Sequence, residues 1–483
     1  MYLKSKHIYL RMAVLTAAAL ILSSCTGVTE KVDTAAVQDI LAKINRTPLG
    51  VTVAVEDDSI RIEPEDRHTF RVTLENPDLS FNQEIYRSFG MEMPEFTIPV
   101  DLNRIQLLYA PSRKYLAIGS AGPLNMTFDP SKLDAEAFPG GEGAGELSRM
   151  TFSYEIKEMT GSFYDISPVL DYEDEGAVEL LTDILQHNQE FSVQAKNLAM
   201  EVAGGKEGEP LSRFTWTTGA MESGFEAAPE YIRAFFQPLE EKGVFEPYLK
   251  DNKPLFDMHF RMDDTRVAFT AGENPISVDI KLAGGSYYLR PEKDSQFNFG
   301  FAWEIEGAEA SGDQIPAWAA ALKINRMDFR FNVSGIPPDL IEGYFEMMQF
   351  IREAAEKKSD DLQGRIAMKG LALVGKMTNA QPVITMQLVP LDLGAGKIEA
   401  EGEFKFIGMA PPVGKATVMI PDFEGMAEKL QQIPAIPKEK IEPMLAKIRT
   451  IFDVKETGEA VLVFEIREDE PGRFYLNGQP HKF

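Results

Sequence analysis

The sequence predicts an α+β protein with extended, curved antiparallel β-sheets, amphipathic helices packed on the apolar face of the sheets, and strand–helix units that repeat. Apolar and polar residues alternate along many segments, which is typical of strands with one dry and one solvated face. Segments with helical periodicity interrupt these strands. The alternating segments are not the continuous apolar runs of a parallel sheet, so antiparallel pairing is favoured.

The alternation is clearest in five segments. The segment FNFGFAWEI at 297–305 places four aromatic side chains on one face. A strand with this pattern has to cover its aromatic face with a helix, another sheet or a ligand. The other four segments are 256–262, 276–282, 327–333 and 397–406.

Helical periodicity is strongest in 339–356, where apolar residues recur three and four positions apart. Pro337 and Pro338 suit the first turn of this helix, and Lys357 and Lys358 suit the negative end of its dipole. Further helices are predicted in the segments 34–44, 175–187, 228–245, 422–433 and 441–452.

Two segments share the order of a strand end, Ser-Gly, one or more prolines, an acidic residue and an aromatic-rich helix, and a third segment is a looser copy. Their sequences are ESGFEAAPEYIRAFF, VSGIPPDLIEGYF and VMIPDFEGMAEKL. They indicate a repeating unit of antiparallel strands followed by a helix. The alternative is that similar helix-start chemistry arose independently in each.

Two segments are predicted boundaries. GGEGAGE at 140–146 has no apolar side chain larger than Ala, and EGAEASGDQIP at 306–316 is small, acidic and ends in proline. We therefore expect a signal segment followed by three regions. Their ranges are 1–24, 25–140, 147–306 and 315–483.

The N-terminus has the layout of a bacterial export signal, with Lys4, Lys6 and Arg11 followed by an uncharged apolar run at 12–22. Small residues then lead to Cys25, the only cysteine of the chain. The sequence LSSC at 22–25 resembles the lipobox of bacterial lipoprotein precursors. The alternative is a cleaved signal with an incidental cysteine.

The lipobox resemblance implies cleavage before Cys25 and attachment of acyl chains to it, so the membrane would be a partner through these chains. It also implies a lipid-anchored protein that faces the periplasm. Thr26 after the cysteine favours the outer over the inner membrane. A chain with one cysteine has no internal disulfide, so its stability has to come from its core.

A formal charge of −26 argues against nucleic acid as a partner, because binding to phosphates needs a basic surface. No segment predicts a cofactor, a metal or a catalytic site. GMAPPVGKAT at 408–417 has the wrong glycine spacing for a phosphate loop, and DYEDEG at 171–176 departs from a calcium loop. We read the first as a turn between strands. His68, His187, His259 and His481 are too far apart in sequence to form a helical ligand pair, and we expect the first three to be dispensable.

The alternating strands, the Phe-rich helices and the terminal YLNGQP turn resemble the YdgA-like bacterial envelope proteins and, more distantly, the AsmA-like lipid-handling proteins. The resemblance implies a curved sheet whose apolar side holds lipid. We therefore expect a non-enzymatic lipoprotein that binds or handles lipid or another amphiphile. The alternatives are an envelope scaffold for protein interactions and, third, a hydrolase without a local signature. The candidate residues for a ligand groove are Phe297, Phe299, Phe301, Trp303, Phe329 and Phe331.

Overall fold

The protein is described here by a computed structural model, and its chain forms two compact units. Unit 1 comprises residues 1–224 and 267–273, and unit 2 comprises residues 225–266 and 274–483. The structure describes residues 32–48, 50–66, 68–82, 97–128, 151–161, 164–173, 176–188, 190–204, 212–239, 241–271, 274–292, 296–312, 315, 323–357, 362–407, 412–432, 438–470 and 473–482. The predicted signal segment, Cys25 and the predicted boundary at 140–146 lie outside these residues.

Unit 1 contains two antiparallel sheets that share the strand β7 (Tyr115–Phe128). One sheet pairs β1 with β4, β4 with β5, β5 with β7, β7 with β8, and β8 with β10. The other sheet pairs β2 with β3, β3 with β6, β6 with β7, and β7 with β9. The bounds are β1 (Val51–Ala54), β2 (Ile60–Pro64), β3 (Phe70–Glu75), β4 (Asp78–Asn82), β5 (Thr97–Leu102), β6 (Arg104–Ala110), β8 (Thr151–Gly161), β9 (Tyr164–Asp165) and β10 (Glu190–Gly204).

Three helices complete the core of unit 1: α2 (Thr34–Ile44), α5 (Ser167–Leu170) and α6 (Ala177–His187). The carboxylate of Asp33 caps α2 by accepting a hydrogen bond from the backbone N–H of Ala36 at 3.0 Å. The apolar stripes of these helices are buried against residues of β1, β2, β3 and β6. The helices predicted at 34–44 and 175–187 are therefore confirmed.

Unit 2 is organised around an antiparallel sheet in which β13 to β18 pair in chain order, followed by β20, β21 and β22. Strand β11 (Ser212–Ala227) and strand β12 (Phe256–Ala271) are each divided between the two units. The other bounds are β13 (Asn274–Glu292), β14 (Gln296–Gly312), β15 (Ile324–Ile336), β16 (Val383–Asp392), β17 (Lys397–Lys405), β18 (Val413–Ile420), β19 (Asp453–Val454), β20 (Ala460–Ile466), β21 (Arg473–Leu476) and β22 (Gln479–Lys482).

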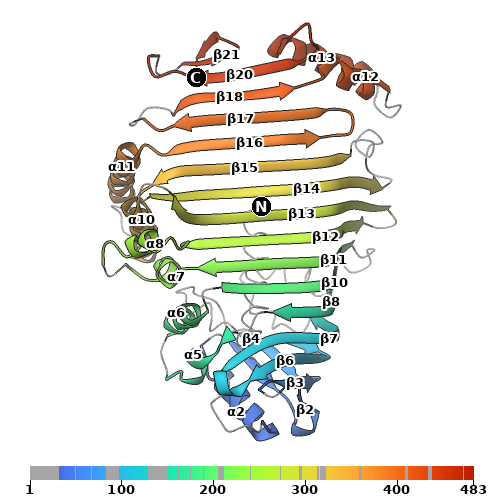
Figure 1. The fold of residues 1–483 in the computed structure, drawn as a ribbon, viewed down its shortest axis with the longest axis vertical. Helices are drawn as coiled ribbons and strands as arrows, with labels where there is room; N and C mark the ends of the chain where they lie inside the picture. Colours follow the sequence, from blue (N-terminus) through green and yellow to red (C-terminus); the bar gives the residue numbers. More distant parts are fainter. Residues whose placement is uncertain are drawn as a thin grey trace. The chain divides into compact units, whose positions relative to one another are not determined.

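The helices of unit 2 cover the apolar face of the sheet near the ends of the strands (Figure 1). One core joins α7 (Pro229–Phe236) and α10 (Pro338–Lys357) to Leu289 near the end of β13 and Phe297 near the start of β14. A second core joins α12 (Phe423–Gln432) and α13 (Lys438–Ile451) to Ile420 at the end of β18 and Ala460 at the start of β20. Helices α8 (Glu246–Lys250) and α11 (Leu362–Ala380) complete the set described in unit 2.

Among the described elements from β11 onward, a strand followed by two helices occurs three times, as β11–α7–α8, β15–α10–α11 and β18–α12–α13. These are the three segments in which the sequence predicts a repeat. Four strands, β12 to β15, separate α8 from α10, so the first two helix pairs lie at the same end of the strands. Three strands, β16 to β18, separate α11 from α12, so the third pair lies at the opposite end (Figure 1).

The apolar alternation in β13 and β14 changes phase at Gly307. On β14 the apolar positions are odd-numbered up to Ile305 and even-numbered from Ala308. Gly307 has a φ of +66° and interrupts the pairing, which has the same register on both sides of it. The Nζ of Lys281 lies 3.1 Å from Oε1 of Glu306, so these two side chains share a face although one residue number is odd and the other is even. The polar face, and with it the apolar face, is therefore continuous through the phase change.

We predict that Gly307→Ala lowers the free energy of unfolding by about 1–2 kcal/mol, because an L-residue is strained at this φ. An added Cβ would also lie 2.9 Å from the Cβ of Lys281. The matched control is Gly370→Ala in α11, where no heavy atom lies within 4 Å of the new Cβ. It should raise stability by about 0.5–1 kcal/mol. Urea unfolding of both variants checks the prediction, and a neutral Gly307→Ala would contradict it.

The structure confirms the predicted α+β class with extended antiparallel sheets and helices on the apolar face. Of the segment 408–417, predicted as a turn between strands, residues 413–417 belong to β18, and residues 408–411 lie outside the described residues. Residues 306–312, predicted as the start of a boundary, instead continue β14, because Ala308, Ala310 and Gly312 still alternate with polar residues. The division into three regions at 25–140, 147–306 and 315–483 stays a prediction. None of the helices in the described part of the chain is long and apolar enough to cross a bilayer.

Candidate functional site

The middle of the unit 2 sheet carries apolar side chains in rows that run across the strands. Residues directly opposite each other in an antiparallel pair point to the same face, so the register defines each row. We call this apolar side the aromatic face. Its three rows are Tyr287–Phe301–Phe331–Met386–Gly402–Ala416–Phe464, Gly285–Trp303–Phe329–Leu388–Ala400–Val418–Leu462 and Leu289–Phe299–Val333–Ile384–Phe404–Gly414–Ile466.

The rings of the aromatic face lie against one another along and between the rows. Phe301 is at the centre, with its ring centroid 5.0 Å from that of Phe331 and 5.9 Å from that of Tyr287 in stacked arrangements. The Trp303 ring makes edge contacts with Tyr287 at 6.2 Å and with Phe260 of β12 at 6.0 Å. Such contacts add about 0.5–1.5 kcal/mol per pair to area burial, so neighbouring side chains hold the rings in place within the sheet.

The aromatic face is half-exposed in its middle. Phe299 and Trp303 retain 38% and 39% of their accessible surface, and Met386 is also exposed. Phe301, Phe329 and Phe331 are intermediate in burial. The buried cores begin only toward the strand ends, where the helices pack. Covering the exposed part of one large ring, roughly 60–100 Å², would contribute about 1.5–2.5 kcal/mol.

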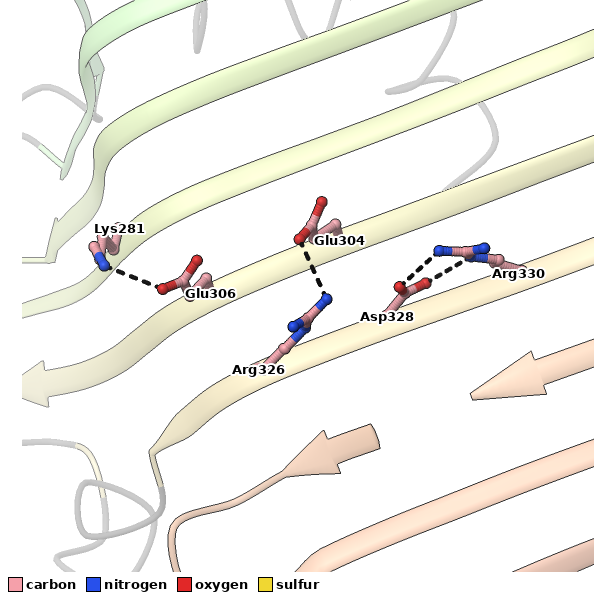
Figure 2. Close-up of polar contacts among 6 residues, drawn as sticks. All are labelled: Lys281, Glu304, Glu306, Arg326, Asp328 and Arg330. Atoms are coloured by element: carbon pink, nitrogen blue, oxygen red, sulfur yellow. Dashed lines mark hydrogen bonds and ion pairs between the residues drawn. The ribbon is translucent and has the colours of Figure 1, made fainter. Parts of the chain in front are cut away.

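The opposite face of the same strands is charged and solvated (Figure 2). Arg330 donates two hydrogen bonds to the carboxylate of Asp328, both at 3.0 Å, and this bidentate contact raises the pKa of Arg330. Lys281 pairs with Glu306, and Arg326 lies 4.0 Å from Glu304. These groups are solvent-exposed or partly so, so their pairing contributes little to stability. The two faces of the sheet thus differ sharply in the kind of molecule they can contact.

The structure places five of the six predicted groove residues together on the aromatic face: Phe299, Phe301, Trp303, Phe329 and Phe331. Phe297 is a correction. It is fully buried in the core with Phe345 of α10, because the helices cover the sheet at this end of β14. It is therefore not available to a ligand.

Sequence reasoning missed three residues of this site: Phe260 as a neighbour of Trp303, and Tyr287 and Met386 in the row of Phe301. Apolar and polar residues alternate in the segments containing Phe260 and Met386, so this alternation could have identified both strands. Tyr287 follows the phase change in β13, which hides its face from a simple period-two pattern.

The histidines lie apart from this face or on the surface. His68 and His187 are exposed, and His187 contacts the carbonyl oxygen of Asp183 through Nδ1 at 2.8 Å. His259 is exposed on β12, and His481 stacks on Phe474 of the terminal hairpin. Within the residues the structure describes, His, Cys, Asp and Glu side chains form no group of three that could hold a metal ion.

Glu342 of α10 is a buried acid within the helical end of unit 2, and its Oε1 accepts a hydrogen bond from the backbone N–H of Gly243 at 2.7 Å. Burial raises the pKa of Glu342 above its ordinary value of 4.5, although Gly243 and Lys376 oppose the shift. Because the pKa of Glu342 is raised in the folded state, protonated Glu342 stabilises the fold. This stabilisation is fully present below the ordinary pKa of 4.5 and is lost as pH rises through the raised pKa.

We therefore predict that Glu342→Gln, which keeps an acceptor for Gly243, removes this fall in stability with rising pH. Glu342→Ala leaves the partly buried N–H of Gly243 without its partner and should cost about 1–3 kcal/mol at every pH. Both predictions are tested by unfolding free energies measured from about pH 4 to about pH 8, the range over which a carboxyl group with a raised pKa titrates. Parallel pH profiles for wild type and Glu342→Gln would contradict the first expectation.

Comparisons of the chain with protein-family models, with curated proteins and with solved structures find no match. The arrangement of the aromatic face is therefore the feature that indicates a function.

Proposed function

We propose that this chain is a non-enzymatic lipoprotein of the bacterial envelope that binds lipid or another amphiphile on the aromatic face of unit 2. The observation that carries the proposal is the half-exposed set of rings around Phe301, on a sheet whose other face is charged. Large apolar side chains that are exposed together on one face are typical of an interaction site. The face combines aromatic rings with a flexible methionine, Met386, which suits a ligand of variable shape.

An acyl chain matches the dimensions of the central row. Neighbouring strands are about 4.8 Å apart, so the row from Tyr287 to Met386 crosses three intervals and spans about 14 Å. One leaflet of a bilayer has a hydrocarbon thickness of about 15 Å. Beyond Met386 the row continues through Gly402 and Ala416, which carry no side chain larger than a methyl group. An acyl tail lying on the row would contact rings along its length.

The chemistry of the site supports binding over catalysis. The residues in the three rows are apolar apart from the hydroxyl group of Tyr287, so they offer no general acid, base or nucleophile to a bound molecule. A charged head group would lie beyond the rows or in solvent. We therefore favour a role in holding or passing on an amphiphile.

The experiment that tests this function is purification of residues 26–483, the mature chain without Cys25, in the absence of detergent, followed by native mass spectrometry and solvent extraction. We expect a co-purifying amphiphile, or uptake of a fluorescent phospholipid offered in vesicles. A protein that carries no amphiphile and takes up none would overturn the proposal. A single co-purifying protein that occupies the same face would instead favour the scaffold.

The tether is a separate part of the proposal. We expect the native protein to carry acyl chains on Cys25 and to fractionate with membranes, outer rather than inner. Intact-mass measurement of the mature N-terminus checks this, and Cys25→Ser should remain unprocessed or leave the membrane fraction. An unmodified Cys25 in the wild-type protein would overturn the tether and leave the binding face unaffected.

A further inference from the structure

The aromatic face continues past β20 to the edge of the unit 2 sheet. Phe464 of the central row lies opposite Leu476 of β21, and Leu476 lies opposite Gln479 of β22. Phe474, two residues before Leu476 and therefore on the same face, lies opposite His481. From β13 to β22 the central row crosses eight strand intervals, about 38 Å, whereas one leaflet of a bilayer has a hydrocarbon thickness of about 15 Å. A single tail therefore covers only part of the row at any time.

Apolar contacts connect the centre of the aromatic face to this edge. The rings of Phe404, Phe464, Phe474 and His481 contact one another in this order, with centroid distances of 6.1, 5.5 and 5.3 Å. Among the described residues of the rows, none between Met386 and Phe474 is charged. A tail that moves across these strands therefore stays in apolar contact.

Helices cover the apolar surface along the direction of the strands. On β13 and β14, Leu289 and Phe297 are buried in the core with α7 and α10. On β18 and β20, Ile420 and Ala460 lie one position beyond the row of Trp303 and are buried in the core with α12 and α13. An amphiphile on the central row therefore meets helices when it moves along these strands, and further apolar surface when it moves across them.

Strand β22 forms the edge of the unit 2 sheet and pairs with β21 (Figure 1). The aromatic face becomes polar there, because Gln479 and His481 are exposed and carry an amide and an imidazole. Both groups can form hydrogen bonds, which the side chains of Leu476 and Phe474 on the neighbouring strand cannot. The terminal hairpin of β21 and β22 thus offers contacts to a polar head group directly beside contacts to an apolar tail.

We infer that the amphiphile enters and leaves the aromatic face over the terminal hairpin, with its head group beside Gln479 and His481. This inference rests on the proposed function, because it needs an amphiphile on the face. A tail lifted straight off the rows would expose all of its methylene groups to water at once, and the free energy of exposure grows with the apolar area. A tail that moves across the strands keeps its apolar contacts until it reaches the edge. The route over β22 is therefore the faster one.

The first test follows the loading of residues 26–483 from vesicles that contain a fluorescent phospholipid. A benzophenone amino acid replaces Gln479 in one protein and Met386 in another, and brief irradiation at successive times records when each position captures lipid. The control position is Pro480, the next residue of β22, which lies opposite Tyr475 on the polar face. We expect capture at Gln479 to precede capture at Met386, with little capture at Pro480.

The second test measures the rate of uptake in Leu476→Glu, which places a carboxylate on the route. We expect uptake to be about tenfold slower with the same final amount bound, because the passing tail has to remove this charge from water. Pro480→Glu, which adds the same charge on the opposite face, should keep the wild-type rate.

Normal uptake without earlier capture at Gln479, or with an unchanged rate in Leu476→Glu, would overturn the route and leave the proposed function standing. A smaller final amount in Leu476→Glu without a slower rate would also overturn it, because the hairpin would then hold the amphiphile rather than admit it. Absence of uptake by the unsubstituted protein would overturn the proposed function, and the route with it.

Discussion

Phe345→Ala is expected to lower the free energy of unfolding of unit 2 by about 3–5 kcal/mol, the largest stability effect that we predict for this protein. Phe345 is fully buried between the two helical repeats, and its ring contacts those of Tyr231, Phe235 and Phe245 at centroid distances of 5.3, 4.9 and 6.1 Å. Truncation would remove the ring and leave a cavity at the point where α7 and α10 meet.

The matched control is Tyr344→Ala, one residue earlier on the same helix. Tyr344 is exposed, so its removal should cost about 1 kcal/mol or less. Hydrogen exchange followed by mass spectrometry locates the effect, since peptides from α7, α10 and the start of β14 should lose protection together. Similar losses in the two variants would contradict the assignment of this cluster as the core of unit 2.

Phe301→Asp is expected to reduce the amount of bound amphiphile by about tenfold or more, which corresponds to about 1.4 kcal/mol or more of binding free energy. The carboxylate would lie in the centre of the aromatic face, where contact with an acyl chain would remove it from water. Uptake of a fluorescent phospholipid by the mature chain measures the change. Thermal unfolding has to be measured alongside it, because Phe301 also stabilises its neighbours through ring contacts.

The control for Phe301→Asp is Ala302→Asp, which introduces the same group at the next residue. Ala302 pairs with Arg330 across the polar face, so the added carboxylate meets a solvated cation and lipid uptake should not change. Trp303→Gln offers a second test with less risk to folding, as the Trp303 ring is already half-exposed. If lipid uptake persists in Phe301→Asp and Trp303→Gln, the aromatic face is not the binding site.

Most strands of unit 2 could be predicted from the sequence because each has one polar, solvent-exposed face and one apolar face. The alternation in 297–305, 327–333 and 397–406 corresponds to parts of β14, β15 and β17, and the helix predicted at 339–356 is α10 (Pro338–Lys357). Proline at the start and a single apolar stripe made α10 recognisable. These features depend only on local sequence, which explains why they were accessible.

Other features depend on contacts that a local pattern does not contain. Helix α11 was not predicted, since its apolar residues and its three glycines form no single apolar stripe. The phase change at Gly307 was missed because each half of the strand alternates normally and only the pairing shows that they share one face. Phe297 and Phe299 look equivalent in sequence, yet the position of α10 buries the first and leaves the second exposed.

The most direct test of amphiphile binding on the aromatic face is photo-crosslinking in living cells at two adjacent residues of β16. Met386 lies in the central row of the aromatic face beside Phe331, while Gln387 lies on the polar face opposite Arg330, and both are exposed. With a benzophenone amino acid at each position in turn, we expect lipid to be captured at Met386 and not at Gln387. Equal capture at both positions, or capture at Met386 of this protein's own segments alone, would contradict the proposal that the aromatic face binds an amphiphile.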